Sequence, residues 1–514
     1  MPSESEAHTP KGSILARTAL GAFWMVAWRM ATRLLGLVST LILVRLLVPE
    51  DFGLIALAAS FATALNVALT LGVEEQIIRA RAPDRAMYDT GFTLNLLRGV
   101  LVGALVWAAA APAADFFDEA RLEPVLLALA LSAALSGLAN IAVVDFRRDL
   151  RFDREFTLNL YPRLAGIAVT IGLAFLVRSH WALVAGIFVN RFGMVVMSYT
   201  MHAYRPRLTL VAWRSLAGIS AWTWALSMAT MVKDRSESLV IGRLLGTTSV
   251  GHYAVGVEIA TLPATEVVEP ICRACMPGFA ASHRAEADAG RDNFLRISAL
   301  LALLTLPAGV GISAVAGPVV ALGFGQPWLE AVPVVAILGI AGMLTLFGNV
   351  STALLLAHAR LALLMVITIG AGALRLALLL LLTPTLGLTG AALAVGASVL
   401  AEHVVLVQRA LVLLRLPPPA LLARLWRPTL AAGLMAVLLW GTGLGWAPPP
   451  GTAGSAALLL AQGAALGALA YALALFALWA LSGRPPGAET DLLGLLHRLL
   501  GRLTMLRPAQ RRSA

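Results

Sequence analysis

The sequence contains little charge and almost no cysteine. Charged residues make up 13% of the 514 positions, and the only cysteines are Cys272 and Cys275. Two cysteines exclude the disulfide framework that holds small secreted domains together. Their CxxC spacing does not make a tetrahedral metal site, because that site needs further ligands and no second Cys or His cluster lies nearby. We interpret them as structurally neutral residues at a helix end, and we predict no metal and no cofactor.

Patterns typical of enzymes are also missing. No Ser-His-Asp, metal-ligand or Walker pattern occurs in the sequence. The longest segment expected on the outer side of a membrane, 112–123, contains no His. The sequence therefore predicts no catalytic residue and no enzymatic activity.

Long apolar runs fill most of the chain. The hydrophobic fraction is 59% and the mean hydropathy is +0.83, above the range of soluble globular domains. A membrane-spanning helix needs about 20 mainly apolar residues, since its backbone groups must be satisfied inside the segment. We predict an all-α polytopic membrane protein with fourteen transmembrane helices, or alternatively twelve. The fourteen spans are 18–47, 53–78, 88–111, 124–145, 157–177, 181–201, 216–246, 250–274, 295–317, 329–357, 361–383, 387–408, 428–446 and 455–481.

The basic residues follow the expected topology. The net charge is +11, but the basic clusters come after every second predicted helix, so the charge does not indicate nucleic-acid binding. The alternate connections hold acidic residues or almost no charge. The positive-inside rule then predicts a bacterial inner-membrane protein with both termini in the cytoplasm, and polar residues 1–16 give no sign of a signal peptide. The basic exits include Arg79, Arg81, Arg85, Arg147, Arg148, Arg151, Arg154, Arg205, Arg207, Arg214, Arg360, Arg409, Arg415, Arg424 and Arg427.

The chain is internally duplicated. An offset of 198 residues places VRLLVPEDFGLIALA on GRLLGTTSVGHYAVG, and it also brings Trp24 onto Trp222 and Gly53 onto Gly251. Six predicted helices separate the copies, so both copies have the same orientation in the membrane. A generic helix–loop–helix corner would also explain the RLL motif by itself. We predict two pseudo-symmetric six-helix lobes. The expected parts are a cytoplasmic tail 1–16, lobes 17–203 and 204–415, two additional helices within 416–482, and a basic amphipathic tail 483–514.

Cations lie in the middle of two equivalent helices. Arg29 and Arg33 are four residues apart on the first predicted span, and Lys233 and Arg235 lie near the middle of the seventh. One charge at the bilayer centre costs roughly 2.5 to 17 kcal/mol, so such residues are expected to face the interior or a water-filled cavity. We predict that these four residues bind an anionic substrate, for which Arg offers bidentate donors.

Acidic residues near these cations leave an alternative open. Asp234 and Glu237 lie beside Lys233 and Arg235, and Glu74 and Glu258 belong to the second and eighth predicted spans. Each could bind a coupling proton or sodium ion, and each could equally balance basic residues in a structural ion-pair network.

The sequence resembles a known transporter family. The segment RLLGLVSTLILVRLLVPEDFGLIALA looks like the N-terminal signature of Wzx-type polysaccharide flippases, in the multidrug/oligosaccharidyl-lipid/polysaccharide exporter superfamily. GQPWLEAVPVVAILGIAGML and TLGLTGAALAVGASV resemble later regions of the same family, so the likeness covers about residues 15–410. The resemblance implies two six-helix lobes that move undecaprenyl-pyrophosphate-linked oligosaccharides to the periplasmic leaflet by alternating access. It further implies that the products serve lipopolysaccharide, capsule or exopolysaccharide synthesis, with polysaccharide polymerase machinery as a partner.

Two rival functions share parts of this pattern. A MATE-like drug or cation antiporter would have the same fold, but a cationic drug calls for acidic residues in the cavity rather than an excess of basic ones. A membrane glycan polymerase or ligase would usually need a sizeable outer loop with clustered catalytic residues. The sequence specifies neither the sugar nor the coupling ion, and it gives no residue evidence that helices thirteen and fourteen form a lipid groove.

Overall fold

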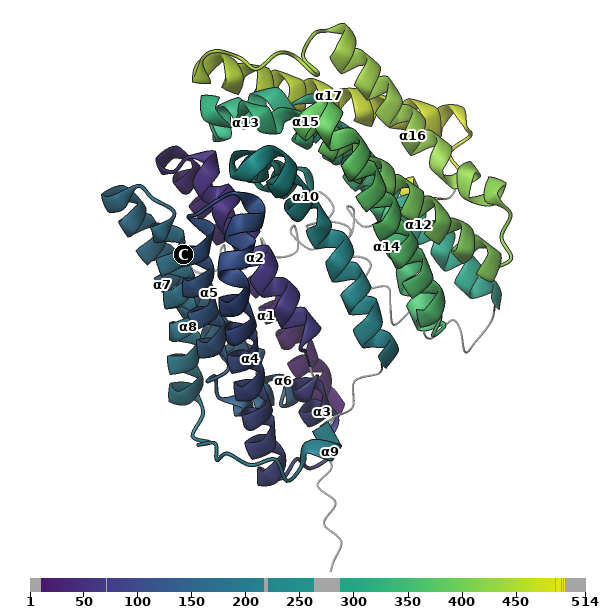
Figure 1. The fold of residues 1–514 in the computed structure, drawn as a ribbon. Coiled ribbons are helices and arrows are strands. Elements are labelled where there is room, and N and C mark those ends of the chain that lie inside the picture. The colour runs from purple at the N-terminus through teal and green to yellow at the C-terminus, as the bar shows by residue number, and fades with distance from the viewer. Residues whose placement is uncertain are drawn as a thin grey trace, which may run out of the picture. The chain divides into compact units, whose positions relative to one another are not determined.

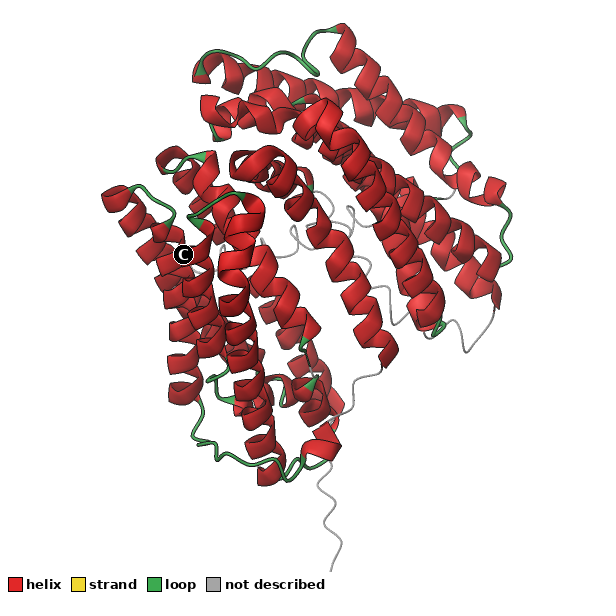
Figure 2. Ribbon diagram, viewed as in Figure 1, coloured by secondary structure: helices red, strands yellow, loops and turns green. Residues whose placement is uncertain are grey.

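The chain folds as a set of long α-helices. A computed structural model describes residues 11–70, 72–216, 221–262, 287–485, 487–490, 492 and 494. Figure 2 shows helices and connecting loops and no strand within these ranges. Cys272 and Cys275, and most of the predicted amphipathic tail, lie outside the described residues. The predicted all-α class is therefore confirmed.

The helices divide into two units, each of which has its own internal contacts. The first contains residues 1–231 and 246–251, and the second contains 232–245 and 252–514. The first unit includes α1 (Lys11–Leu46), α2 (Pro49–Ala68), α3 (Val73–Arg79), α4 (Arg85–Phe117), α5 (Leu122–Ser136), η1 (Ile141–Val144), α6 (Asp145–Arg148), α7 (Phe152–Val177), α8 (Trp181–Met201) and α9 (Trp213–Leu216). Within this unit α4, α5, α7 and α8 run side by side (Figure 1).

The second unit continues the chain after α10 (Ala221–Ala260), a helix that contributes segments to both units. Its other elements are α12 (Ala287–Ala314), α13 (Ala316–Gly323), η3 (Gln326–Ala331), α14 (Val332–Ala357), α15 (Leu361–Leu413), α16 (Pro418–Gly441) and α17 (Ala453–Leu481). A buried apolar core joins α12, α14, α15, α16 and α17 around residues such as Leu301, Val350 and Leu439.

The helix boundaries agree with most of the predicted spans. The span 181–201 coincides with α8, and the span 455–481 differs from α17 by two residues at one end. The described residues contain nine helices long and apolar enough to cross a membrane, or up to ten if the bent segment 122–148 counts as one span. The count of fourteen stays a prediction, because residues 263–274 of the predicted span 250–274 lie outside the described residues.

Local breaks interrupt several predicted spans. Glycine permits the positive φ that a sharp reversal needs, and Gly387 has φ 59° within the run of α15, where the predicted spans 361–383 and 387–408 meet. Gly72, with φ 63°, separates α2 from α3, so the predicted span 53–78 is two helices rather than one. The predicted span 124–145 bends by 73° after α5, where Asn140 caps η1 through a 3.1 Å bond from the backbone N–H of Ala142.

Large apolar side chains remain on the surface of both units. Leu176 is 81% exposed, Trp440 71% and Leu481 85%. A soluble monomer rarely exposes so many large apolar groups, whereas lipid is a suitable solvent for them. The helix lengths and this surface together show a multi-pass membrane protein.

Candidate functional site

A network of charges joins α10 to α15 inside the second unit. The side chains of Lys233, Glu237, Arg375 and Glu402 are largely buried, whereas that of Asp234 is 52% exposed. The ammonium Nζ of Lys233 lies 2.7 and 2.8 Å from the two carboxylate oxygens of Glu402. The Lys233 side chain is 11% exposed and that of Glu402 is 8% exposed. This geometry is a charge-assisted pair in which both partners are largely withdrawn from solvent.

Arg375 is the second fixed cation of this network. Its Nη1 donates to Glu237 Oε1 at 3.0 Å and lies 3.6 Å from Asp234 Oδ1. Its Nε donates to the hydroxyl oxygen of Ser398 at 3.0 Å. Tyr253 also donates its hydroxyl to Glu237. Because the Arg375 side chain is only 5% exposed, these contacts replace the water that its guanidinium would otherwise bind.

Two members of the network were absent from the predicted site. Glu402 is a lone acid within the apolar span 387–408, and Arg375 lies within the predicted span 361–383. A single ionisable residue in a membrane span generally indicates a buried partner of opposite charge or a transport pathway. The sequence therefore offered a reason to include Glu402 in the predicted site. Its partner could not be read from the sequence, since Lys233 is separated from it by 169 positions.

The other predicted cations occupy different surroundings. Arg33 is partly buried on α1, within the first unit. Arg163 reaches α1 from α7 and donates to the backbone oxygen of Thr32 at 3.3 Å. Arg29 lies in α1, and Arg235 follows Asp234 in α10 and is partly buried. Within the described ranges Arg235 has no ion-pair partner.

The remaining predicted acids are separate from this network. Glu74 is exposed on α3 and pairs with Arg147, with 3.3 Å between its Oε2 and the Nη1 of the arginine. Glu258 is partly buried on α10. Among the described residues no group of three His, Cys, Asp or Glu side chains is arranged to hold a metal ion. Asp234 and Glu237 are the predicted acids that contact Arg375 in the charge network.

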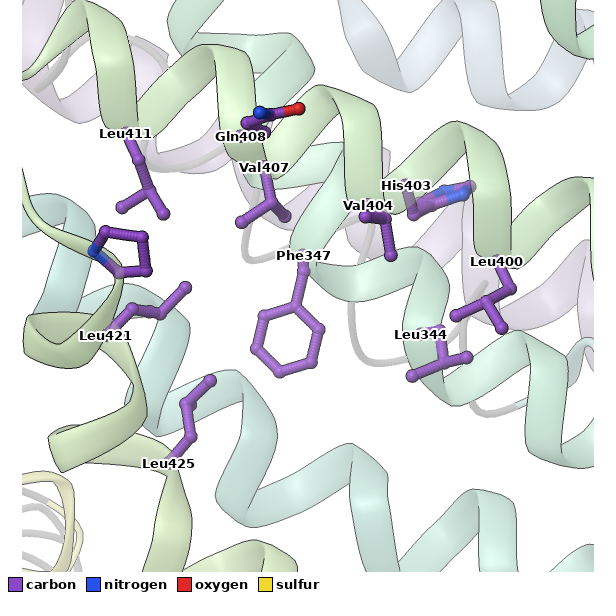
Figure 3. A pocket seen from close by; sticks show the side chains of 11 residues that line it. Leu344, Phe347, Leu400, His403, Val404, Val407, Gln408, Leu411, Leu421 and Leu425 are labelled. Carbon is purple, nitrogen blue, oxygen red and sulfur yellow. The ribbon is translucent and has the colours of Figure 1, made fainter.

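An apolar cavity of about 470 Å³ lies elsewhere in the second unit. Its walls come from α14, α15 and α16, with Phe347 and Leu425 pointing into it (Figure 3). His403 and Gln408 are the polar members of its lining, and His403 Nδ1 lies 2.7 Å from the backbone oxygen of Val399. A cavity lined in this way suits a hydrocarbon chain and not a phosphate or a sugar.

A loop between α4 and α5 holds a smaller charged cluster in the first unit. The Nη2 atom of Arg121 lies 2.5 Å from Glu50 Oε1 and 2.8 Å from Glu119 Oε2. The hydroxyl of Thr247 also donates to Glu119, at 3.2 Å. The hydrogen bonds from Arg121 hold the pKa of the Glu119 carboxyl below its usual range, against the opposing effect of burial.

Comparison with known proteins identifies the family. A family model described as a polysaccharide biosynthesis protein matches residues 42–333, more than half of the chain. The chain belongs to this polysaccharide biosynthesis family. The match confirms the resemblance to Wzx-type flippases inferred from the sequence.

Relatives with curated names agree with the family match. The chain is 24% identical to the lipopolysaccharide biosynthesis protein WzxC of Escherichia coli (strain K12) over 68% of this chain and 71% of that protein. It is 25% identical to the succinoglycan biosynthesis transport protein ExoT of Rhizobium meliloti (strain 1021), over 63% of this chain and 66% of ExoT. It is also 22% identical to the teichuronic acid biosynthesis protein TuaB of Bacillus subtilis (strain 168), over 57% of this chain and 62% of TuaB.

Solved structures share the fold of this family member. A structure of the lipid II flippase MurJ matches with a TM-score of 0.65 and 12% identity, over 88% of this chain and 99% of MurJ. An inward-facing multidrug MATE transporter of the same exporter superfamily matches with a TM-score of 0.60 and 15% identity, over 74% of this chain and 94% of the transporter. At these identities the likeness shows the fold alone.

Proposed function

We propose that this chain is a flippase that moves an undecaprenyl-pyrophosphate-linked oligosaccharide from the cytoplasmic to the periplasmic leaflet. The family match over residues 42–333 carries the proposal. The names of the relatives support it, because one concerns lipopolysaccharide biosynthesis and another concerns succinoglycan transport. The product would serve lipopolysaccharide, capsule or exopolysaccharide synthesis, and polysaccharide polymerase machinery would act on it after transport.

The charge of the substrate explains why cations are needed inside the membrane. A diphosphate cannot cross hydrocarbon unaided, whereas its polyprenyl tail can remain in lipid. Arg29, Arg33 and Arg235 would donate to the diphosphate oxygens, and guanidinium groups suit this task because they offer planar paired donors. The duplication supports this assignment, since it makes α1 and α10 equivalent helices. Lys233 was predicted to act with them, but its contact with Glu402 favours a different role.

The surrounding acids would balance charge rather than bind substrate. Asp234 and Glu237 face Arg375, and Glu74 faces Arg147. Glu258, which is partly buried on α10, would be the remaining candidate for proton coupling. We assign no catalytic residue and no cofactor to the transport cycle.

The proposed setting is the bacterial inner membrane with both termini in the cytoplasm. The distribution of arginine supports this topology through the positive-inside rule. We also propose that the division into 1–16, 17–203, 204–415, 416–482 and 483–514 describes the duplicated lobes and their additions. Alternating access would then arise from movement of the two six-helix copies.

A MATE-like drug or cation antiporter is the second candidate, because a transporter of that kind shares the fold at a TM-score of 0.60. A glycan polymerase or ligase is a weaker third candidate, because the sequence has no sizeable outer loop with clustered catalytic residues. Its substrate would already lie on the outer leaflet. The decisive experiment deletes the gene and locates the accumulated lipid-linked oligosaccharide with a membrane-impermeant lectin. A flippase defect leaves the oligosaccharide protected in spheroplasts, whose outer membrane has been removed, and exposed after lysis. Lectin access in spheroplasts supports the polymerase, and increased drug sensitivity with normal polysaccharide supports the antiporter.

A further inference from the structure

Lysine is rare in this chain and one of its two copies lies inside the membrane. The sequence contains Lys11 and Lys233, and its other strongly basic residues are all arginine. The two side chains are not equivalent. A guanidinium is broad and planar, whereas an ammonium is a compact point charge. Lys233 therefore places the basic group that most resembles a monovalent metal ion in the middle of α10.

The ammonium of Lys233 lies among carboxylates from two helices. It lies 2.7 and 2.8 Å from the oxygens of Glu402 on α15 and 4.0 Å from Asp234 Oδ1 on its own helix. The stem passes close to α15, since a Cβ built on Gly372 would lie 3.4 Å from the Cβ of Lys233. The ammonium is thus held in place by its packing as well as by its charge.

A second fixed cation lies beside Lys233 and shares Asp234 with it. Arg375 contacts Glu237 at 3.0 Å and lies 3.6 Å from Asp234. Three carboxylates from α10 and α15 consequently share two cations that belong to the chain. Carboxylate oxygens are also the ligands that a hard metal cation prefers. In the described part of the chain, however, no acidic or His group has the arrangement of a metal site.

We propose that the ammonium of Lys233 is a tethered substitute for a coupling metal cation, so that this carboxylate cluster binds no sodium ion during transport. The statement about transport rests on the proposed flippase function, whereas the statement about cation binding stands by itself. The Lys233–Glu402 pair would remain part of the protein throughout the cycle. Removing the ammonium while keeping the carboxylates should create a cation site that the natural chain does not have.

The test measures thermal unfolding of the purified full-length protein in sodium chloride or in choline chloride at equal ionic strength. Choline is too large to enter the space of an ammonium group. We expect the midpoint of the natural protein to be the same in both salts. The midpoint of Lys233→Met should be lower in choline and should rise with sodium concentration to saturation. The double variant Lys233→Met/Glu402→Gln should lose the sodium response.

Arg424→Met provides the matched control. Arg424 lies 3.8 Å from Asp292 in an exposed pair of the same unit, so its removal deletes one cation without removing a cation from the carboxylate cluster. Its midpoint should be the same in both salts. A saturable sodium response of the natural protein that disappears in Glu402→Gln would overturn the proposal. Absence of a sodium response in folded Lys233→Met would overturn it as well.

A transport measurement decides the matter if Lys233→Met does not fold. Vesicles that contain the natural protein are supplied with a lipid-linked oligosaccharide in sodium or choline medium. Equal flipping rates in the two media support the proposal, and a several-fold loss in choline contradicts it. If no flipping occurs in either medium, the proposed function fails, and the salt response of the natural protein's unfolding midpoint still tests cation binding.

Discussion

Gly53 and Gly251 pack against each other's helical segments with the same geometry in both directions. A Cβ on Gly53 would lie 1.7 Å from the backbone oxygen of Thr247, and a Cβ on Gly251 would lie 1.9 Å from the backbone oxygen of Pro49. Both segments belong to the first unit. The offset of 198 residues that aligns the two copies relates Pro49 to Thr247 and Gly53 to Gly251. The contact is therefore self-complementary, as expected at a two-fold axis between duplicated segments.

This contact predicts that even a methyl group is not tolerated at either glycine. Gly53→Ala and Gly251→Ala should each destabilise the protein by about 2 kcal/mol or more, because a backbone oxygen cannot move away as a flexible side chain could. The thermal unfolding midpoint in detergent measures the effect. Gly172→Ala in α7 is the matched control, since nothing lies within 4 Å of the added Cβ. Gly172→Ala should be neutral or slightly stabilising. Equal midpoints for all three variants would show that the close approach does not exist.

Breaking the contacts of Arg375 should lower the stability of the folded protein. Arg375→Met leaves the buried carboxylate of Glu237 without its 3.0 Å partner, and removal of one member of a buried pair typically costs about 3 to 5 kcal/mol. The double variant Arg375→Met/Glu237→Gln should recover part of this stability, because both charges are then absent. A double-mutant cycle on the unfolding midpoint provides the measurement. Additive losses would argue against a direct interaction between the two groups.

Arg33 should affect transport more than stability. Arg33→Ala is expected to lower the flipping rate about tenfold, since loss of one charge-assisted hydrogen bond of about 1.5 kcal/mol changes a binding constant by that factor. Arg33→Lys should give an intermediate rate, because it keeps the charge and loses the planar donors. The rate is measured in vesicles, alongside Arg424→Ala as an exposed-pair control. An unchanged rate in Arg33→Ala would remove Arg33 from the proposed site.

Much of the fold could be predicted from the sequence, and the pairing of charges could not. Long apolar runs define helices such as α8 and α17, because burial of the backbone in lipid leaves no alternative to a helix. Gly53 and Gly251 were recognised as equivalent through the duplication. The partner of Lys233, by contrast, depends on which faces of α10 and α15 meet. That choice results from packing over the whole unit, so the pairing of Lys233 with Glu402 could not be read from the sequence.

Acid should weaken the contacts of Arg121 outside the membrane spans. Hydrogen bonds from Arg121 lower the pKa of Glu119, so the ionised carboxyl stabilises the fold above its unfolded pKa of about 4.3. This contribution decreases as the pH falls through the lower pKa of the folded state. Arg121→Met should reduce stability by up to about 1 kcal/mol at pH 7, since the pair is partly exposed. The difference from the natural protein should shrink below pH 4, and a constant difference would contradict the assignment.

The buried pair of Arg427 and Glu489 predicts that the segment after α17 helps to stabilise the second unit. The Nε atom of Arg427 lies 3.0 Å from Glu489 Oε1, and the two side chains are 7% and 8% exposed. Truncation after residue 486 should therefore destabilise the protein by about 3 kcal/mol, because it leaves the guanidinium of Arg427 buried and unpaired. Truncation combined with Arg427→Met should recover most of that loss. If the truncated chain and the natural protein unfold at the same temperature, the segment after residue 486 does not stabilise the second unit.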